Sequence, residues 1–218
     1  EGDDWQHALG RAHCVHRMEP FYDTHAHLTF PDFAGDIPDL IERTQATGIT
    51  RIISIGTDLE SSQRAVELTE AHAPVYAVVG WHPNDLAPAP DDVRSDLRVL
   101  CNHPKVVAIG ETGIDHFRLP SSKGGTEAED TAWKERQVKI FRQQLELAAE
   151  LKLNVVIHQR ASLNPTLEIF NEYADRVRGQ FHCFVDDAAS MPNASGMEEC
   201  ISYGENSDGH RNPNCWSP

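Results

Sequence analysis

The amino-acid sequence predicts an α/β protein of the (β/α)₈ TIM-barrel type that lacks the last two βα units. Short apolar runs alternate with helical patterns along the chain, which is typical of parallel strands joined by helices. Nearly every apolar run also ends in a glycine or in a residue that can do chemistry. The carboxyl ends of the strands converge on one mouth in a barrel, but they are spread along an edge in an open doubly wound sheet. This pattern therefore favours the barrel.

Six apolar runs predict the strands. They end, in chain order, near His25, Gly56, Gly80, Glu111, His158 and His182. The runs RIISIG, VYAVVG, VVAIGE and NVVIH are almost continuously apolar, as expected of parallel strands that are covered on both faces. Helical patterns lie between the strands, with Pro and Gly at the joints, at residues 36–48, 60–72, 92–103, 129–152 and 164–177.

The chain divides into three consecutive segments. Residues 1–17 show neither the period of a strand nor that of a helix, and we expect a disordered extension there. Residues 18–191 carry the alternation and are predicted to form the barrel. Residues 192–218 are rich in Asn, Pro, Gly and Ser and contain no apolar run, so we expect an irregular tail. Six strands do not close an eight-stranded barrel, which leaves strand edges unpaired.

The composition limits the classes of function. The formal net charge of −15 argues against a basic surface that coats nucleic acid, but not against an enzyme that holds phosphate through bound cations. No apolar run approaches the roughly 18 residues of a membrane span, and no Gly-rich phosphate loop is present. Five scattered cysteines without a C-x-x-C pair indicate reduced thiols, and hence a cytoplasmic protein.

Polar residues at the strand ends predict a metal site. His25 and His27 are two residues apart on one strand, so their imidazoles and the Asp23 carboxylate face a single point. Other strand ends carry Glu111, His158 and His182. Each of these residues alone could be a hydrogen-bonded structural group. Four imidazoles and one carboxylate at the same mouth, however, suit a site for one or two divalent cations.

Three further positions lie close to these strand ends. His82, in the motif GWHP, either contacts a substrate at the mouth or shapes the loop before Pro83. Cys183 is expected to point away from the site, because neighbouring residues on a strand face opposite ways. Asp58 is predicted to cap the helix that follows it.

Five motifs in order, DTHAHL, GWHP, AIGETGID, VVIHQR and FHCF, resemble the TatD family of metal-dependent nucleases over residues 20–191. The resemblance implies an amidohydrolase-like barrel that trims single-stranded DNA, and in some cases RNA, from the 3′ end. It also implies two divalent metal ions, Mg²⁺, Mn²⁺ or Zn²⁺. His25 and His27 would hold one ion and His158 and His182 the other. Glu111 would lie between the ions as the catalytic carboxylate that orients the attacking water.

The chain departs from the family pattern after Met191. That pattern implies two further βα units and a metal-binding aspartate on the last strand, whereas the late Asp208 lies in a segment unlike a strand end. We therefore expect a truncated or divergent carboxyl-terminal part and impaired activity. Two alternatives stay open. One is an amidohydrolase that cleaves an amide or ester, which a lysine at a strand end would favour; the other is a non-catalytic remnant with a binding role. The sequence indicates no oligomeric state.

Overall fold

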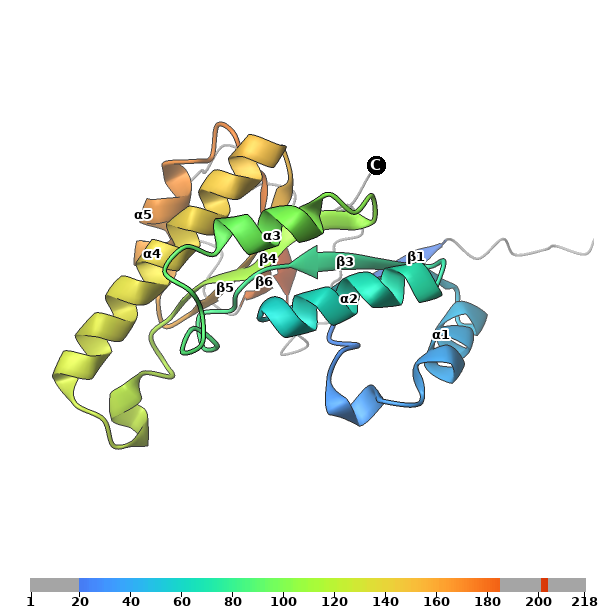
Figure 1. The fold of residues 1–218 in the computed structure, drawn as a ribbon, viewed down its shortest axis with the longest axis horizontal. Coiled ribbons are helices and arrows are strands. Elements are labelled where there is room, and N and C mark those ends of the chain that lie inside the picture. Colours follow the sequence, from blue (N-terminus) through green and yellow to red (C-terminus); the bar gives the residue numbers. More distant parts are fainter. Residues whose placement is uncertain (1–19, 185–200, 204–218) are drawn as a thin grey trace, which may run out of the picture.

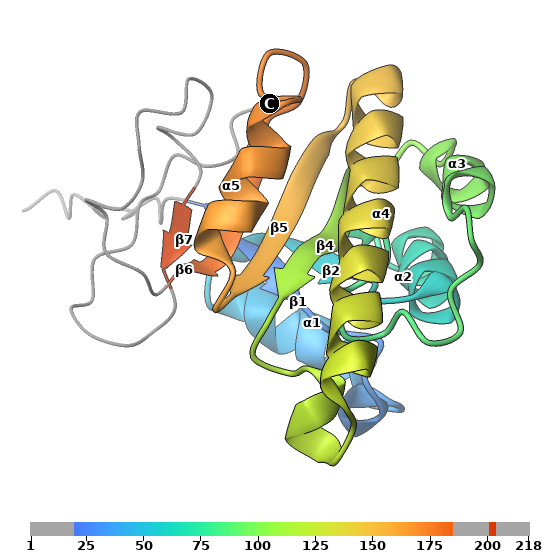
Figure 2. The same ribbon diagram turned by 90° about the vertical axis from the view of Figure 1, so that its left-hand side faces the viewer.

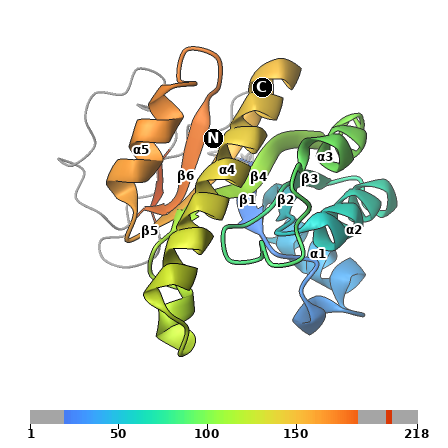
Figure 3. The ribbon, with the colours of Figure 1, turned by 60° about the vertical axis from the view of Figure 1, so that its left-hand side comes forward.

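The computed structural model describes residues 20–184 and 201–203. Within these residues, parallel strands form one seven-stranded sheet in chain order (Figure 1). The strands are β1 Phe21–Ala26, β2 Ile49–Ile55, β3 Val75–Val79, β4 Val106–Asp115, β5 Asn154–Arg160, β6 Gly179–Phe184 and β7 Ile201–Tyr203. The sheet is curved like part of a barrel wall, and helices α2 to α5 cover one of its faces (Figures 2 and 3).

All five predicted helices are present, with two short 3₁₀ segments beside them. The helices are α1 Ile37–Ala46, α2 Leu59–Ala71, α3 Arg94–Cys101, α4 Glu127–Leu151 and α5 Leu163–Asn171, and the 3₁₀ segments are Pro31–Phe33 and Pro120–Lys123. Helix α5 ends six residues before the predicted boundary at residue 177. The backbone N–H groups of Glu172 and Tyr173 bond to carbonyls three residues back, which tightens the chain into turns.

Strand β4 is longer than predicted and does not end at Glu111. Residues 112–115 continue the ladder with β5, where Gly113 lies opposite His158 and Asp115 lies opposite Arg160. Gly113 has a φ of +141°, and a Cβ there would lie 2.0 Å from the carbonyl oxygen of His158. Only glycine therefore allows the two strands to approach this closely.

Strand β7 lies in the segment for which an irregular tail was predicted. Ile201 is in register with Phe181 of β6, and Tyr203 is in register with Phe184. Three residues are too few to show a period of two, so hydrophobic periodicity does not reveal this strand. The predicted extension at residues 1–17 lies outside the described residues, as does Asp208.

Alternate residues of the central strands point to opposite faces of the sheet. Ala77 and Val79 of β3 belong to the large apolar cluster under the helices, whereas Val78 belongs to a smaller cluster on the other face. Phe141 and Leu145 of α4 are fully buried in the large cluster. Both faces of the central strands are thus packed, and their carboxyl ends are held on a rigid frame.

Helix α4 is the longest helix and is fixed at its amino end by a capping box. The Thr126 hydroxyl accepts a hydrogen bond from the Glu129 N–H at 3.3 Å, and the Glu129 carboxylate accepts one from the Thr126 N–H at 2.7 Å. Charged residues recur along the helix. No helix in the described part of the chain is both long and apolar enough to cross a membrane.

Candidate metal centre

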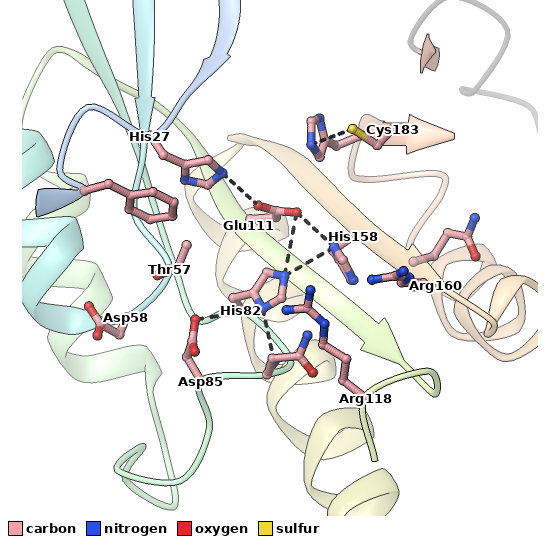
Figure 4. A pocket seen from close by; sticks show the side chains of 14 residues that line it. His27, Thr57, Asp58, His82, Asp85, Glu111, Arg118, His158, Arg160 and Cys183 are labelled. Carbon is pink, nitrogen blue, oxygen red and sulfur yellow. Dashed lines mark hydrogen bonds and ion pairs between the residues drawn. The ribbon is translucent and has the colours of Figure 1, made fainter. Parts of the chain in front are cut away.

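A pocket of about 730 Å³ opens at the carboxyl ends of the strands. It is lined by His27, Phe30, Thr57, Asp58, His82, Asn84, Asp85, Glu111, Arg118, His158, Gln159, Arg160, His182 and Cys183 (Figure 4). Glu111 of β4 lies at its centre and is only 3% exposed. Histidines at or just beyond the ends of other strands surround this carboxylate, as the convergence of strand ends predicts.

One oxygen of Glu111 faces His25 of β1 and His27, which directly follows that strand. Glu111 Oε2 lies 3.3 Å from His25 Nε2 and 3.8 Å from His27 Nε2, and the two imidazole nitrogens are 3.2 Å apart. The ring of His182, from β6, stacks on that of His25 with 3.4 Å between centroids. His25, Glu111 and His182 form a group that could hold a metal ion.

The other oxygen of Glu111 faces a second group. Glu111 Oε1 lies 3.0 Å from His158 Nδ1 and 3.8 Å from His82 Nε2, and these two nitrogens are 3.2 Å apart. His82, Glu111 and His158 form the second group that could hold a metal ion. Glu111 thus belongs to both groups, as expected of a carboxylate between two cations.

The spacing of these atoms fits metal coordination. Two ligand atoms bound to one ion at about 2.1 Å lie roughly 3.0–3.5 Å apart. The contacts of His25 with His27 and Glu111, and of His158 with Glu111, fall in this range, at 3.2, 3.3 and 3.0 Å respectively. Imidazole and carboxylate ligands together suit zinc and manganese. Geometry and donor chemistry are therefore both compatible with divalent cations.

Asp115, at the end of β4, fixes the orientation of the His158 ring. His158 Nε2 donates to Asp115 Oδ2 at 3.1 Å, which leaves Nδ1 facing Glu111. Asn84 Nδ2 donates to the same Asp115 oxygen at 2.8 Å. A carboxylate behind a histidine is the usual way to fix the tautomer of a metal ligand. Asp115 was not among the site residues predicted from the sequence.

Two buried glutamines of α4 hold the backbone on either side of the pocket. Gln144 accepts from the Trp81 N–H at 2.9 Å and donates to the Trp81 carbonyl at 3.0 Å, immediately before His82. Gln137 accepts from the Asp115 N–H at 3.1 Å and donates to the Pro83 carbonyl at 3.1 Å. Both side chains are completely buried. Helix α4 therefore sets the position of the β3 loop relative to the end of β4.

His82 presents a donor to the pocket. Its Nδ1 accepts a hydrogen bond from the Asn84 N–H at 3.1 Å, so the neutral ring carries its proton on Nε2. That Nε2–H faces Glu111 and His158. Both functions considered for His82 are thus compatible with the structure. The residue shapes its loop through Asn84, and it directs a polar group towards whatever occupies the pocket.

Burial and hydrogen bonding shift the pKa values in opposite directions. Burial alone would raise the pKa of Glu111, but hydrogen bonds from His158 and His25 hold it well below its usual value. Burial alone would lower the pKa of His158, but hydrogen bonds to Asp115 and Glu111 raise it to about 9. Burial lowers the pKa of His82 to about 4, and burial together with the nearby His25 lowers that of His182 to about 4. Three states of charge therefore coexist around the pocket: an ionised carboxylate, a protonated imidazole and neutral imidazoles.

The predicted residues converge, with two differences in detail. The donor atom of His182 is grouped with His25 and Glu111, and His158 is grouped with His82. The resemblance instead implies that His158 pairs with His182, and the distribution of residues over ions stays a prediction. The Asp23 carboxylate accepts from the His25 backbone N–H at 3.1 Å and is not among the pocket-lining residues.

The prediction for Cys183 is wrong, and that for Asp58 is confirmed. Cys183 lines the pocket, with its Sγ 3.0 Å from His182 Nε2. Its φ of +47° breaks the alternation of the strand, so the side chain turns to the mouth. Asp58 caps α2 by accepting from the Ser61 N–H at 2.7 Å.

Known proteins resemble the chain over most of its length. The chain is 34% identical over 184 residues to the uncharacterized metal-dependent hydrolase YabD of Bacillus subtilis (84% of this chain, 68% of that protein). It is 30% identical to the 3'-5' ssDNA/RNA exonuclease TatD of Citrobacter koseri (84% of this chain, 64% of that protein). The crystal structure of the TatD homolog YJJV from Escherichia coli matches with a TM-score of 0.66 and 30% identity, covering 77% of this chain and 61% of that one.

These likenesses confirm the α/β barrel class, and one of the relatives is named as a metal-dependent hydrolase. The chain spans about two thirds of the length of the proteins it matches. A model of the TatD related DNase family matches residues 22–211, a range that contains both candidate metal groups. The chain is a member of the TatD related DNase family.

Proposed function

We propose that this protein is a metal-dependent phosphodiesterase that releases nucleotides from the 3′ end of single-stranded nucleic acid. The observation that carries the proposal is the position of Glu111 between two histidine groups at the mouth of the sheet. Relatives named 3'-5' ssDNA/RNA exonucleases support the choice of substrate. The ligand atoms are spaced for two cations that share one carboxylate, an arrangement suited to phosphate ester hydrolysis.

The histidines and Glu111 would hold the cations in the proposed site. His25, His27 and His182 would hold one divalent ion, His158 would hold the other, and Glu111 would bridge them. The bound cations would offset charge on the phosphate group and make a water molecule more acidic.

Two residues handle the substrate and the water directly. Glu111 has a lowered pKa, stays ionised at neutral pH and accepts a hydrogen bond from the attacking water, which orients that water. His82 directs its Nε2–H into the pocket and donates to a phosphate oxygen. Because its pKa is about 4, the ring is a neutral donor across the neutral range. Charge at the reacting centre therefore comes from the cations, which makes the site compatible with the net charge of −15.

An exposed aromatic ring at the pocket supports a single-stranded substrate. Phe30 is 42% exposed, lines the pocket and stacks on His27 with 4.6 Å between ring centroids. Unpaired bases stack on such rings, whereas the bases of a duplex are already stacked on one another. A strand end placed beside Phe30 would thus lay its phosphate close to the two metal groups.

Release of 3′ nucleotides from labelled single-stranded DNA tests this function. We expect release with Mn²⁺ or Mg²⁺, no release with EDTA, and a loss of at least about a thousandfold in Glu111→Gln, which keeps the shape but not the charge. The control is His72→Ala, since His72 caps α2 at the opposite end of the sheet. Wild-type release equal to that of Glu111→Gln would refute the proposal. An amide or ester cleaved under the same conditions would then favour an amidohydrolase.

A further inference from the structure

Arg118 and Arg160 differ from most arginines of this acidic chain. Seven other arginines in the described residues form ion pairs with carboxylates: Arg43, Arg64, Arg94, Arg98, Arg136, Arg142 and Arg176. Within the same part of the chain, Arg118 and Arg160 have no such ion pair, although both line the pocket (Figure 4). The nearby carboxyl of Asp85 has its pKa raised, chiefly by burial, and Arg118 only partly offsets that shift.

The backbone brings these two arginines to the same side of the centre as His158. Arg160 is the last residue of β5 and lies in register with Asp115. The Arg118 N–H donates to Asp115 Oδ1 at 2.9 Å, and the His116 N–H donates to the Arg160 carbonyl at 2.9 Å. Asp115, which orients His158, therefore also anchors the chain segments that carry both arginines.

The Arg160 guanidinium is held flat by an aromatic ring. It lies over the ring of Phe117 with 3.9 Å between the guanidinium carbon and the ring centroid. Stacking leaves the planar edge of the guanidinium, with its N–H donors, free to bind an anion. Phe117 is itself 58% exposed, so the stacked pair lies at the rim of the pocket.

Two guanidinium groups in one pocket repel each other unless an anion lies between them. Their forked donors match the oxygens of a phosphate, which they bind through two parallel hydrogen bonds. We propose that Arg118 and Arg160 form a subsite for a second phosphate of the nucleic-acid strand, next to the phosphate that reacts at Glu111. This inference rests on the proposed function, because it takes the substrate to be a strand with more than one phosphate.

Binding measured without metal isolates this subsite from hydrolysis. The assay is fluorescence anisotropy of fluorescein-labelled (dT)₁₀ in EDTA, at NaCl concentrations from about 20 to 150 mM, where phosphate contacts dominate affinity. We expect Arg118→Ala and Arg160→Ala each to weaken binding about fivefold at the lowest salt. In the double variant, the slope of log affinity against log salt should become shallower by about 0.7, the value for one phosphate on a single strand.

The matched control is Arg51→Ala. Arg51 also stacks on an aromatic ring, that of Tyr22 at 5.0 Å, but it lies towards the amino end of β2, away from the pocket. The subsite is supported if Arg51→Ala keeps the wild-type affinity for (dT)₁₀ and the wild-type salt dependence. The affinity must at the same time fall in Arg118→Ala and Arg160→Ala, and the salt dependence must become shallower in the double variant. Equal losses in all three variants, or no loss in the pocket variants, would overturn it.

The two proposals fail in different ways. Nucleotide release by the metal-loaded protein, with (dT)₁₀ binding unchanged in Arg118→Ala and Arg160→Ala, would keep the nuclease and reject the subsite. Weakened binding in both variants, with no release by the wild type, would keep the subsite and reject the nuclease.

Discussion

Gly113→Ala tests the close approach of β4 and β5 that brings Glu111 and His158 together. The added Cβ would lie 2.0 Å from the His158 carbonyl oxygen, so the two backbones must separate. Such a displacement costs about 1–3 kcal/mol, and the φ of +141° adds about 1–3 kcal/mol of strain. We expect a loss of about 4 kcal/mol in the free energy of unfolding, a large part of the 5–15 kcal/mol typical of a domain.

A second glycine separates the two causes. Gly124 also has a positive φ, +89°, but an added Cβ would meet nothing within 4 Å. Gly124→Ala should therefore cost only about 1–2 kcal/mol, through strain alone. Urea unfolding followed by circular dichroism in EDTA measures both variants without a contribution from bound metal. Equal losses in the two variants would refute the close approach of the strands at Gly113.

Three further predictions concern the histidine network and a helix cap. In the metal-free protein the pKa of His158 is about 9, so a metal at Nδ1 must displace a proton. The apparent Mn²⁺ affinity should therefore rise about tenfold per pH unit from pH 6.5 to 8.5. An affinity that does not depend on pH in isothermal titration calorimetry would contradict this. The folded pKa of His158 lies above the unfolded value of about 6.5, so the stability from its bond to Asp115 is complete below about pH 6.5 and is lost as the pH rises through about 9. Asp115→Asn should thus lower the free energy of unfolding by about 2 kcal/mol at pH 6 in EDTA. The difference in urea midpoint between this variant and the wild type should shrink towards pH 9. A difference that stays constant with pH would argue against the bond between His158 and Asp115. Asp58→Ala should lower the free energy of unfolding in urea by about 1 kcal/mol, because the Ser61 N–H loses its acceptor. An unchanged urea midpoint would rule out the cap.

Much of the fold was predictable because local patterns and tertiary packing agree. The apolar run of β5, NVVIH, is buried on both faces in the structure, as its continuous hydrophobicity indicates. The end of α5 was not predictable in the same way. Tyr173 and Val177 continue the apolar period of the helix and are buried, yet the backbone there has already turned. Side-chain periodicity records burial and not backbone conformation, so it does not locate such an end.

Two site residues that were not predicted, Asp115 and Arg160, lie an even number of positions after a predicted metal ligand. Asp115 is four residues after Glu111 on one strand, and Arg160 is two residues after His158, so each shares a face with a predicted metal ligand. The same spacing identified His25 and His27. Cys183 had no such signal, because its orientation depends on a local φ of +47° that no pattern of residue types encodes. Gln137 and Gln144 could not be recognised either, since two of their partners, Pro83 and Trp81, lie more than 50 residues away in the sequence.

Glu111 belongs to both candidate metal groups. The decisive measurement of this shared role is Mn²⁺ binding to the metal-free protein, followed by the electron paramagnetic resonance signal of free Mn²⁺. We expect two Mn²⁺ ions per chain in the wild type and in His72→Ala, and weakened binding of both ions in Glu111→Gln. Binding of both ions in Glu111→Gln with wild-type affinity would rule out a carboxylate shared by two ions, as would a wild-type chain that binds no Mn²⁺.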